Sequence, residues 1–197
     1  MNRQEAKTGT KEIIITGFGG QGIVLAGRIL GQAAALGDRM ESTLIQAYGP
    51  EARGGACSAQ VIISEEVIHY PYVRHPDILI CMSQSGFDKF IDVIKPEGIL
   101  IIDQDLVRQR IERGFFSIPS TRMAEELGRK MMANIIMLGF FASVTGAVTL
   151  ESARDAVKTS VPKGTEEMNI TAFNKGYDYG LALLKGRQKK ALGRTGT

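Results

Sequence analysis

Glu12-Ile13-Ile14-Ile15-Thr16-Gly17-Phe18-Gly19-Gly20-Gln21-Gly22 is the stretch that decides the fold of this 197-residue chain. The β-branched run at 12–16 predicts a buried strand, and the glycines that follow it predict a tight turn. Apolar residues then recur at helical spacing over residues 23–36, which predicts a helix with Gly37 as its C-cap. A strand at 43–47 completes a Rossmann-like βαβ unit, the right-handed crossover typical of parallel sheets.

The remaining sequence alternates short apolar runs with helical patterns. Residues 58–64 predict a third strand, and Glu65-Glu66 predict a turn into a returning strand at 67–70, so we expect a mixed sheet. Ser85 is expected to cap a helix that stops before Pro96. Further strands are expected at 77–81, 99–102 and 115–118, and further helices at 120–127, 132–144, 150–160 and 167–184. The predicted fold class is α/β, a single three-layer α/β/α domain with a mixed, mostly parallel sheet.

Three segments are expected along the chain: a polar lead-in at 1–11, the domain at 12–184, and a basic tail at 185–197. The lead-in has no apolar core of a signal peptide, and no apolar run reaches the ~20 residues of a membrane span, so we expect a cytoplasmic protein with no membrane contact. Five positive charges lie in the tail, and without them the net charge of +3 becomes about −2. The body has no basic stripe or nucleic-acid-binding motif, which disfavours nucleic acid as a partner.

Two cysteines, Cys57 and Cys81, are the chain's complete thiol content. Iron–sulfur clusters normally take four thiolates, so this chain alone is not expected to hold one, and no metal site is predicted. We expect both thiols to be reduced core residues.

Gly17, Gly19 and Gly22 match the G-x-G-x-x-G spacing between a strand and a helix. The backbone N–H groups from Gly20 to Gly22, with Gln21 between them, begin a helix and favour an anion there. A dinucleotide site also needs an acidic residue at the end of the next strand, and the strand at 43–47 has none. From spacing alone, anion binding and close helix–strand packing are equally good explanations of these glycines.

A second loop follows the strand at 43–47 and contains Tyr48, Glu51, Arg53, Gly54 and Gly55. In a parallel sheet this loop and the glycine turn lie at the same carboxyl edge, where ligands bind. The Arg53 guanidinium is suited to a bidentate grip on a carboxylate or phosphate. The pair of loops therefore indicates a binding or interface function.

The segments Gly-Phe-Gly-Gly-Gln-Gly (17–22) and Tyr-Gly-Pro-Glu-Ala-Arg-Gly-Gly (48–55) resemble the paired signatures of the gamma subunit of 2-oxoacid:ferredoxin oxidoreductases, the pyruvate/ketoisovalerate oxidoreductase gamma domain family. Pro76-Asp77-Ile78-Leu79, the turn at 95–98 before a strand ending in Asp103, and Asn134 in its helix are also similar. At this turn the sequence departs slightly, with Gly98 followed by Ile99. The resemblance extends over residues 12–184 in order.

The resemblance implies a subunit of a complex that oxidatively decarboxylates a 2-oxoacid to an acyl-CoA and reduces ferredoxin, with 2-oxoglutarate favoured. It implies partners of three kinds: alpha subunits, beta subunits that bind thiamine diphosphate, and ferredoxin-like subunits. Thiamine diphosphate, Mg, iron–sulfur clusters and coenzyme A are expected in the assembled complex, and none is expected to bind this chain alone. The chain is expected to be inactive alone, to carry no catalytic residue of its own, and to be able to self-associate when isolated.

In that setting, Arg53 is expected to hold an anionic group with help from the N–H groups of the glycine turn. Glu51, Tyr48 and Asn134 are further residues of the predicted cofactor-binding or interface loops. Two alternatives remain open from the residues: an NAD(P)-dependent dehydrogenase, and a stand-alone nucleotide- or CoA-binding α/β module. Binding of NAD(P) or of coenzyme A by the isolated chain distinguishes them from a subunit.

Overall fold

A computed structural model of the chain describes residues 9–48, 56–110 and 112–194. Six strands form one sheet in the order β2-β3-β1-β4-β5-β6. β3 runs antiparallel to both of its neighbours, β1 and β2, whereas β1, β4, β5 and β6 are mutually parallel. The strands are β1 (Lys11–Phe18), β2 (Glu41–Tyr48), β3 (Ala56–Ser64), β4 (Ile78–Cys81), β5 (Ile99–Asp103) and β6 (Phe115–Ile118). The predicted mixed, mostly parallel sheet is confirmed.

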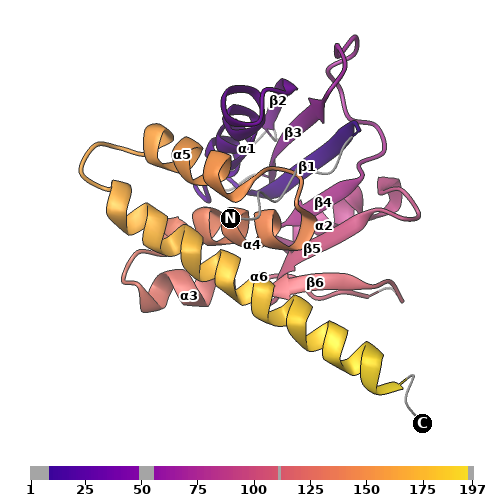
Figure 1. Cartoon of the computed structure of the whole chain (residues 1–197). Coiled ribbons are helices and arrows are strands. Elements are labelled where there is room, and N and C mark those ends of the chain that lie inside the picture. The colour runs from indigo at the N-terminus through magenta and orange to yellow at the C-terminus, as the bar shows by residue number, and fades with distance from the viewer. Residues whose placement is uncertain (1–8, 49–55, 111, 195–197) are drawn as a thin grey trace.

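Helices cover the two faces of the sheet unequally (Figure 1). One face carries α1, α4, α5 and α6, and the opposite face carries α2 with its short continuation η2. The helices are α1 (Ile23–Gln32), η1 (Ala33–Gly37), α2 (Gln84–Phe90), η2 (Ile91–Val93), α3 (Ser120–Glu126), η3 (Lys130–Met132), α4 (Ala133–Thr145), α5 (Leu150–Ser160) and α6 (Glu166–Arg194). The result is a three-layer α/β/α domain, as predicted.

Each buried strand supplies side chains to two separate cores, because successive residues of a strand point to opposite faces. In β1, Ile13 and Ile15 pack under α1 and α4, whereas Ile14 packs on the α2 side. β4 repeats the pattern with Ile80 on the first side and Leu79 on the second. The continuous β-branched run at 12–16 thus reflects a strand that is buried on both faces.

The first βαβ unit differs from the predicted one in its strand order. β1 and β2 run in the same direction, but they are not neighbours, because β3 lies between them and pairs with both. The crossover through α1 therefore spans one intervening strand, and β2 forms an edge of the sheet. The antiparallel insertion follows from the β2–β3 connection, which folds β3 back directly against β2.

The predicted returning strand at 67–70 is wrong. Residues 65–77 form no strand and no helix. The chain extends beyond the end of β3 (Figure 1) and then lies against the α2 side of the sheet, where Val73 is buried and its N–H donates to Gln60 Oε1. Both edges of β3 are already paired, with β1 and with β2, so no edge of β3 remains for a returning strand. The antiparallel hairpin of this fold is instead β2–β3.

Two predicted helix caps are also corrected. Gly37 is the last residue of η1 and has no left-handed backbone; a Cβ at Gly37 would lie 2.3 Å from the Cβ of Ser152, so glycine there permits close packing against α5. The N-cap of α2 is Ser83, whose hydroxyl accepts a hydrogen bond from Gly86 N–H at 3.1 Å, and Ser85 lies inside the helix.

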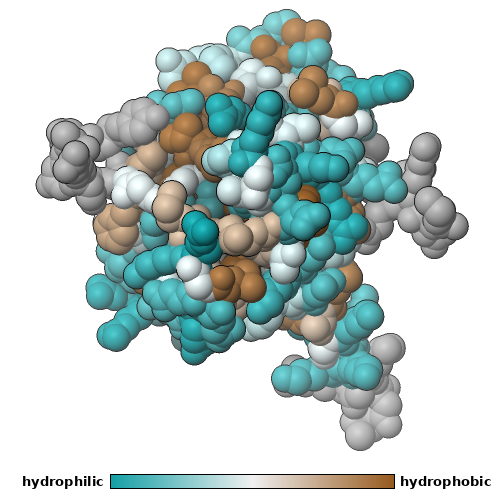
Figure 2. Space-filling view, turned by 90° about the vertical axis from the view of Figure 1, so that its left-hand side faces the viewer, coloured by the Kyte–Doolittle hydropathy of each residue, from teal (hydrophilic) through white to brown (hydrophobic). Residues whose placement is uncertain are grey.

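α6 continues past residue 184 into the basic segment, and its far end extends beyond the sheet (Figure 1). Arg187 anchors this end: its guanidinium donates to the Phe115 carbonyl at 2.7 Å and lies 4.1 Å from the centre of the Phe116 ring. Figure 2 shows a mainly hydrophilic face with hydrophobic residues in separate small groups. Of the helices in the described residues, none has the length and apolar content that a membrane span requires.

Candidate functional site

One edge of the sheet collects the predicted site segments. Cys57, at the start of β3, pairs with Gly17 near the end of β1 and with Tyr48 at the end of β2. The ends of β1 and β2 and the start of β3 therefore lie at one edge of the sheet. Of the two predicted loops, the glycine turn is described at this edge.

Part of the predicted site lies outside the described residues. Glu51, Arg53, Gly54 and Gly55 belong to the segment 49–55, which the structure does not describe, and Tyr48 is described only as the last residue of β2. The described strand ends still fix where this segment begins and ends.

Gln21 holds the glycine turn from inside. Its Oε1 accepts a hydrogen bond from Phe18 N–H at 2.6 Å, and its Nε2 donates to the Met82 carbonyl at 2.9 Å. The Gln21 N–H also donates to the Phe18 carbonyl at 3.1 Å, closing the turn. Gly17 is buried below this side chain, and a Cβ at Gly17 would lie 2.4 Å from Gln21 Oε1. Gln21 therefore ties the turn to the end of β4 and positions its backbone.

Asn134 holds the other end of the turn. Its Nδ2 donates to the Gly22 carbonyl at 3.0 Å, while its Oδ1 accepts from Ile135 N–H at 2.9 Å. The side chain is 2% exposed, so the first turn of α4 fixes the start of α1 from within the protein. Gly22 adopts a left-handed backbone with φ of 72°, and a Cβ there would lie 2.3 Å from Asn134 Nδ2.

The glycine turn presents main-chain rather than side-chain groups to the outside. Gly19 and Gly20 are exposed, and α1 begins at Ile23 with Gly22 as an N-cap that has no side chain to accept a hydrogen bond. No group in the described part of the chain accepts a hydrogen bond from the N–H of Gly20 or Gly22. A helix start of this kind carries roughly half a positive elementary charge, so the exposed edge of the turn suits an anionic group.

The end of β4 is a part of this edge that sequence reasoning missed. The Met82 carbonyl receives Gln21, and the neighbouring Ser83 caps α2. Gly86 in α2 allows the helix to approach β1, because a Cβ at Gly86 would lie 2.4 Å from Thr16 Oγ1. The segment Ser83-Gln84-Ser85-Gly86, soon after a buried strand of a parallel sheet, was the sequence pattern that could have indicated a helix start at this edge.

The cysteines do not form a joint site. Cys57 belongs to the core under α1, and Cys81 belongs to the core on the α2 side, so they face opposite sides of the sheet. Burial raises the pKa of both thiols; for Cys81 the nearby negative charge of Asp88 raises it further. No three His, Cys, Asp or Glu side chains gather at a possible metal position within the residues that the structure covers.

Thiol labelling checks this burial directly. Both cysteines are free and buried with raised pKa, so neither holds the reactive thiolate at neutral pH. We expect almost no reaction with an aromatic disulfide reagent in the native chain and two equivalents after denaturation. Rapid modification of either thiol in the native chain contradicts the described packing.

The junction of Gly22 with Asn134 gives a testable consequence. Gly22→Ala forces an L-residue into the left-handed region and pushes the Asn134 amide off the Gly22 carbonyl. We expect a loss of about 2–4 kcal/mol in the free energy of unfolding, measured by urea titration, from backbone strain and a broken buried hydrogen bond together.

Gly146→Ala is the matched control. Gly146 ends α4 with φ of 61°, and a Cβ there meets no atom within 4 Å. Gly146→Ala is therefore expected to lower the free energy of unfolding by about 1–2 kcal/mol, the cost of the left-handed backbone alone. Equal losses for the two variants contradict the role assigned to Asn134.

The amino-acid sequence is similar to a known protein family and to named members of related enzymes. Residues 12–179 match the family model described as pyruvate ferredoxin/flavodoxin oxidoreductase. The chain is 50% identical over 183 residues to 2-oxoglutarate synthase subunit KorC of Methanocaldococcus jannaschii, covering 90% of this chain and 97% of that protein. It is 32% identical over 172 residues to pyruvate synthase subunit PorC of Methanothermobacter thermautotrophicus, covering 85% of this chain and 94% of that protein.

A solved structure shows the same fold. The gamma subunit of a keto/oxoacid ferredoxin oxidoreductase from Geobacter sulfurreducens superposes with a TM-score of 0.77 at 36% identity. The superposition covers 87% of this chain and 99% of that subunit. Most of this chain is thus matched by nearly the whole of a gamma subunit of such an enzyme.

Proposed function

The chain belongs to the pyruvate ferredoxin/flavodoxin oxidoreductase family, and from this premise we propose that it is the gamma-type subunit of an enzyme complex that oxidises 2-oxoglutarate. The reaction removes carbon dioxide from the 2-oxoacid, joins the remaining acyl group to coenzyme A, and passes two electrons to ferredoxin. The similarity to a 2-oxoglutarate synthase subunit over nearly its whole length is the observation that carries the proposal.

The role proposed for this chain is to complete a binding site rather than to hold the redox centres. Its two thiols are buried on opposite sides of the sheet, which does not fit a set of cluster ligands. Thiamine diphosphate, Mg and the iron–sulfur clusters are accordingly assigned to alpha, beta and ferredoxin-like partner chains, with ferredoxin as electron acceptor. We assign the assembly to the cytoplasm.

The carboxyl edge is the part of the chain that we assign to this shared site. Gln21 and Asn134 use their amide groups in hydrogen bonds within the chain, and the exposed Gly19 and Gly20 leave backbone N–H groups of the turn open to a ligand. A phosphate of coenzyme A is the anion that this chemistry fits best within the proposed reaction. We assign to Arg53, which follows β2 in the sequence, the positive charge that holds this phosphate.

Replacing Arg53 tests this assignment. Arg53→Ala in the assembled complex removes a charge-assisted contact, and such contacts contribute ~1.5–3 kcal/mol. We expect kcat/KM for coenzyme A to fall about 10- to 100-fold with normal assembly, measured by 2-oxoglutarate-dependent dye reduction under anaerobic conditions.

Arg28→Ala is the control, since Arg28 is an exposed arginine on the body of α1. It is expected to leave kcat/KM for coenzyme A unchanged. Kinetics of Arg53→Ala that equal those of the parent complex remove Arg53 from the coenzyme site.

A further inference from the structure

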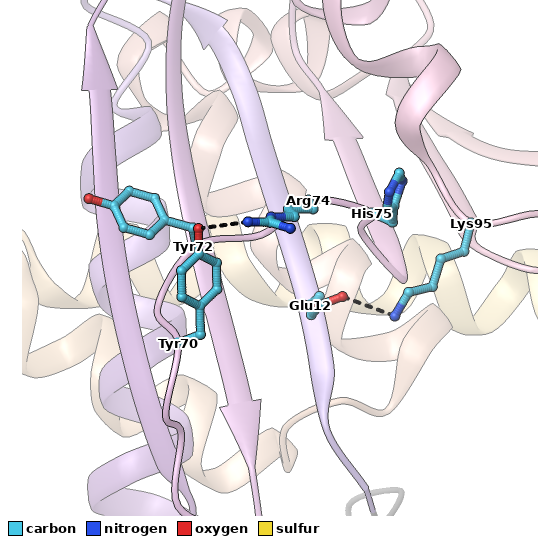
Figure 3. A pocket seen from close by; sticks show the side chains of 6 residues that line it. All are labelled: Glu12, Tyr70, Tyr72, Arg74, His75 and Lys95. Carbon is cyan, nitrogen blue, oxygen red and sulfur yellow. Dashed lines mark hydrogen bonds and ion pairs between the residues drawn. The ribbon is translucent and has the colours of Figure 1, made fainter.

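A shallow cavity lies at the amino edge of the sheet, away from the glycine turn. It measures about 330 Å³ and is open to solvent. Figure 3 shows its lining, which comes from the start of β1, the segment after β3, and the turn before β5. The lining residues are Glu12, Tyr70, Tyr72, Arg74, His75 and Lys95.

Aromatic and guanidinium groups form the centre of this cavity. The rings of Tyr70 and Tyr72 lie 5.4 Å apart, and each tyrosine is about half exposed, at 52% and 50%. The Arg74 guanidinium lies 5.3 Å from the centre of the Tyr70 ring, and its Nη2 donates to the Tyr70 hydroxyl at 3.4 Å (Figure 3). Tyrosine and arginine side chains of this kind dominate the energetics of protein–protein interfaces.

The segment that carries these groups is held in place although it has no regular structure. Val73 is 7% exposed and packs into the core on the α2 side, and its N–H donates to Gln60 Oε1 at 2.9 Å. His75 Nδ1 lies 3.2 Å from the Val93 carbonyl. Tyr72 and Arg74 flank Val73 in the sequence and are thereby presented outward on a fixed support. Little conformational entropy is lost when a partner binds such a surface.

The two cations of the cavity, Lys95 and Arg74, differ in their partners. Lys95 Nζ lies 3.0 Å from Glu12 Oε2 and 3.0 Å from Asp77 Oδ1, so this cation is already neutralised. Arg74 has no carboxylate within ion-pair distance among residues 9–48, 56–110 and 112–194. The free face of its guanidinium is thus complementary to a carboxylate from outside the chain.

The position separates this cavity from the candidate functional site. Glu12 is the second residue of β1, and the glycine turn begins at the other end of the same strand. Six residues of extended strand correspond to about 20 Å. A group bound at the cavity therefore leaves the glycine turn accessible.

We propose that this cavity docks an acidic segment of a partner subunit, with a carboxylate on Arg74 and an adjacent apolar side chain against Tyr70 and Tyr72. Small-molecule sites usually bury 70–90% of their ligand, whereas this depression is open and its tyrosines are half exposed. A projecting peptide segment fits that shape. The inference rests on the proposed function in that the partner belongs to the same complex.

Charge reversal on the full chain tests the proposal. Arg74→Glu is expected to weaken the binding of this subunit to the other purified chains of the complex about 10-fold or more, measured by biolayer interferometry, since it places a negative charge against the partner's carboxylate. Lys158→Glu makes the same charge change on an exposed residue of α5, on the opposite face, and is expected to leave the affinity unchanged.

A photoreactive phenylalanine analogue in place of Tyr72 identifies the occupant independently. We expect a crosslink to an acidic segment of a partner subunit, and a Lys replacing that acidic residue should restore binding to the Arg74→Glu chain. Unchanged affinity of Arg74→Glu overturns the proposal, as does a crosslink confined to a second copy of this chain. Failure of the parent chain to bind any subunit contradicts the proposed function instead.

Discussion

Gly176→Ala is expected to lower the free energy of unfolding by about 3 kcal/mol or more, because it inserts a methyl group where two helix backbones touch. A Cβ at Gly176 on α6 would lie 1.9 Å from the Ile136 carbonyl oxygen on α4. The contact is reciprocal, since a Cβ at Gly139 on α4 would lie 2.0 Å from the Phe173 carbonyl oxygen on α6. Backbone atoms cannot swing aside as a side chain does, so the helices must separate and lose packing over the core.

The control for this prediction lies on the same helix. Gly186 is exposed on α6, and a Cβ there meets no atom within 4 Å. Gly186→Ala is therefore expected to stabilise the chain by up to about 1 kcal/mol through helix propensity. Urea unfolding of the two variants should give shifts of opposite sign. A Gly176→Ala variant as stable as the parent chain contradicts the close crossing of α4 and α6.

Asp103→Ala is expected to cost about 3–5 kcal/mol of stability, since it removes a buried carboxylate that organises the connection from β5 to α3. Asp103 is fully buried, and its Oδ2 accepts hydrogen bonds from the Ser120 hydroxyl and from Thr121 N–H and Oγ1, the last two at 2.9 Å each. Its Oδ1 accepts from Asp105 N–H at 3.0 Å. The alanine variant leaves these donors buried without an acceptor.

Asp105→Ala separates this effect from a general loss of negative charge nearby. The Asp105 carboxylate is paired at 3.7 Å with a largely exposed Arg122, and surface pairs of this kind contribute ~0–1 kcal/mol. Thermal unfolding is expected to show a small shift for Asp105→Ala and a large one for Asp103→Ala. Similar shifts for both variants show that the buried hydrogen bonds of Asp103 are not what stabilises this region.

The fold was predictable where a local pattern reports burial directly. The β-branched run at the start of β1 and the amphipathic pattern of α5 each identified the correct element, because burial alone sets both patterns. Strand order was not predictable in this way. Residues 67–70 have the composition of a strand. Whether they can pair with β3 depends on whether the two edges of β3 are free, and β1 and β2 already occupy both.

The sequence predicted where the glycine turn lies, but not which side chains hold the turn in position. The glycine spacing predicted a turn between a strand and a helix, and the structure has this turn between β1 and α1, whereas the segment 49–55 lies outside the described residues. The inward roles of Gln21 and Asn134 depend on partners 61 and 112 residues away in the sequence, Met82 and Gly22. The sequence likewise identified Asp103 only as the end of a strand. That its carboxylate accepts hydrogen bonds from the start of α3 is seen only in the tertiary structure.

The most direct test of the central claim is purification of the tagged chain from its native host without oxygen, followed by an assay of coenzyme A-dependent dye reduction with 2-oxoglutarate. We expect co-purification of larger chains that carry thiamine diphosphate and iron–sulfur clusters, with kcat/KM higher for 2-oxoglutarate than for pyruvate or 2-oxoisovalerate. A preference for another 2-oxoacid contradicts the substrate proposal alone. A chain that elutes by itself, with no activity on any 2-oxoacid, contradicts its role as a subunit of this enzyme.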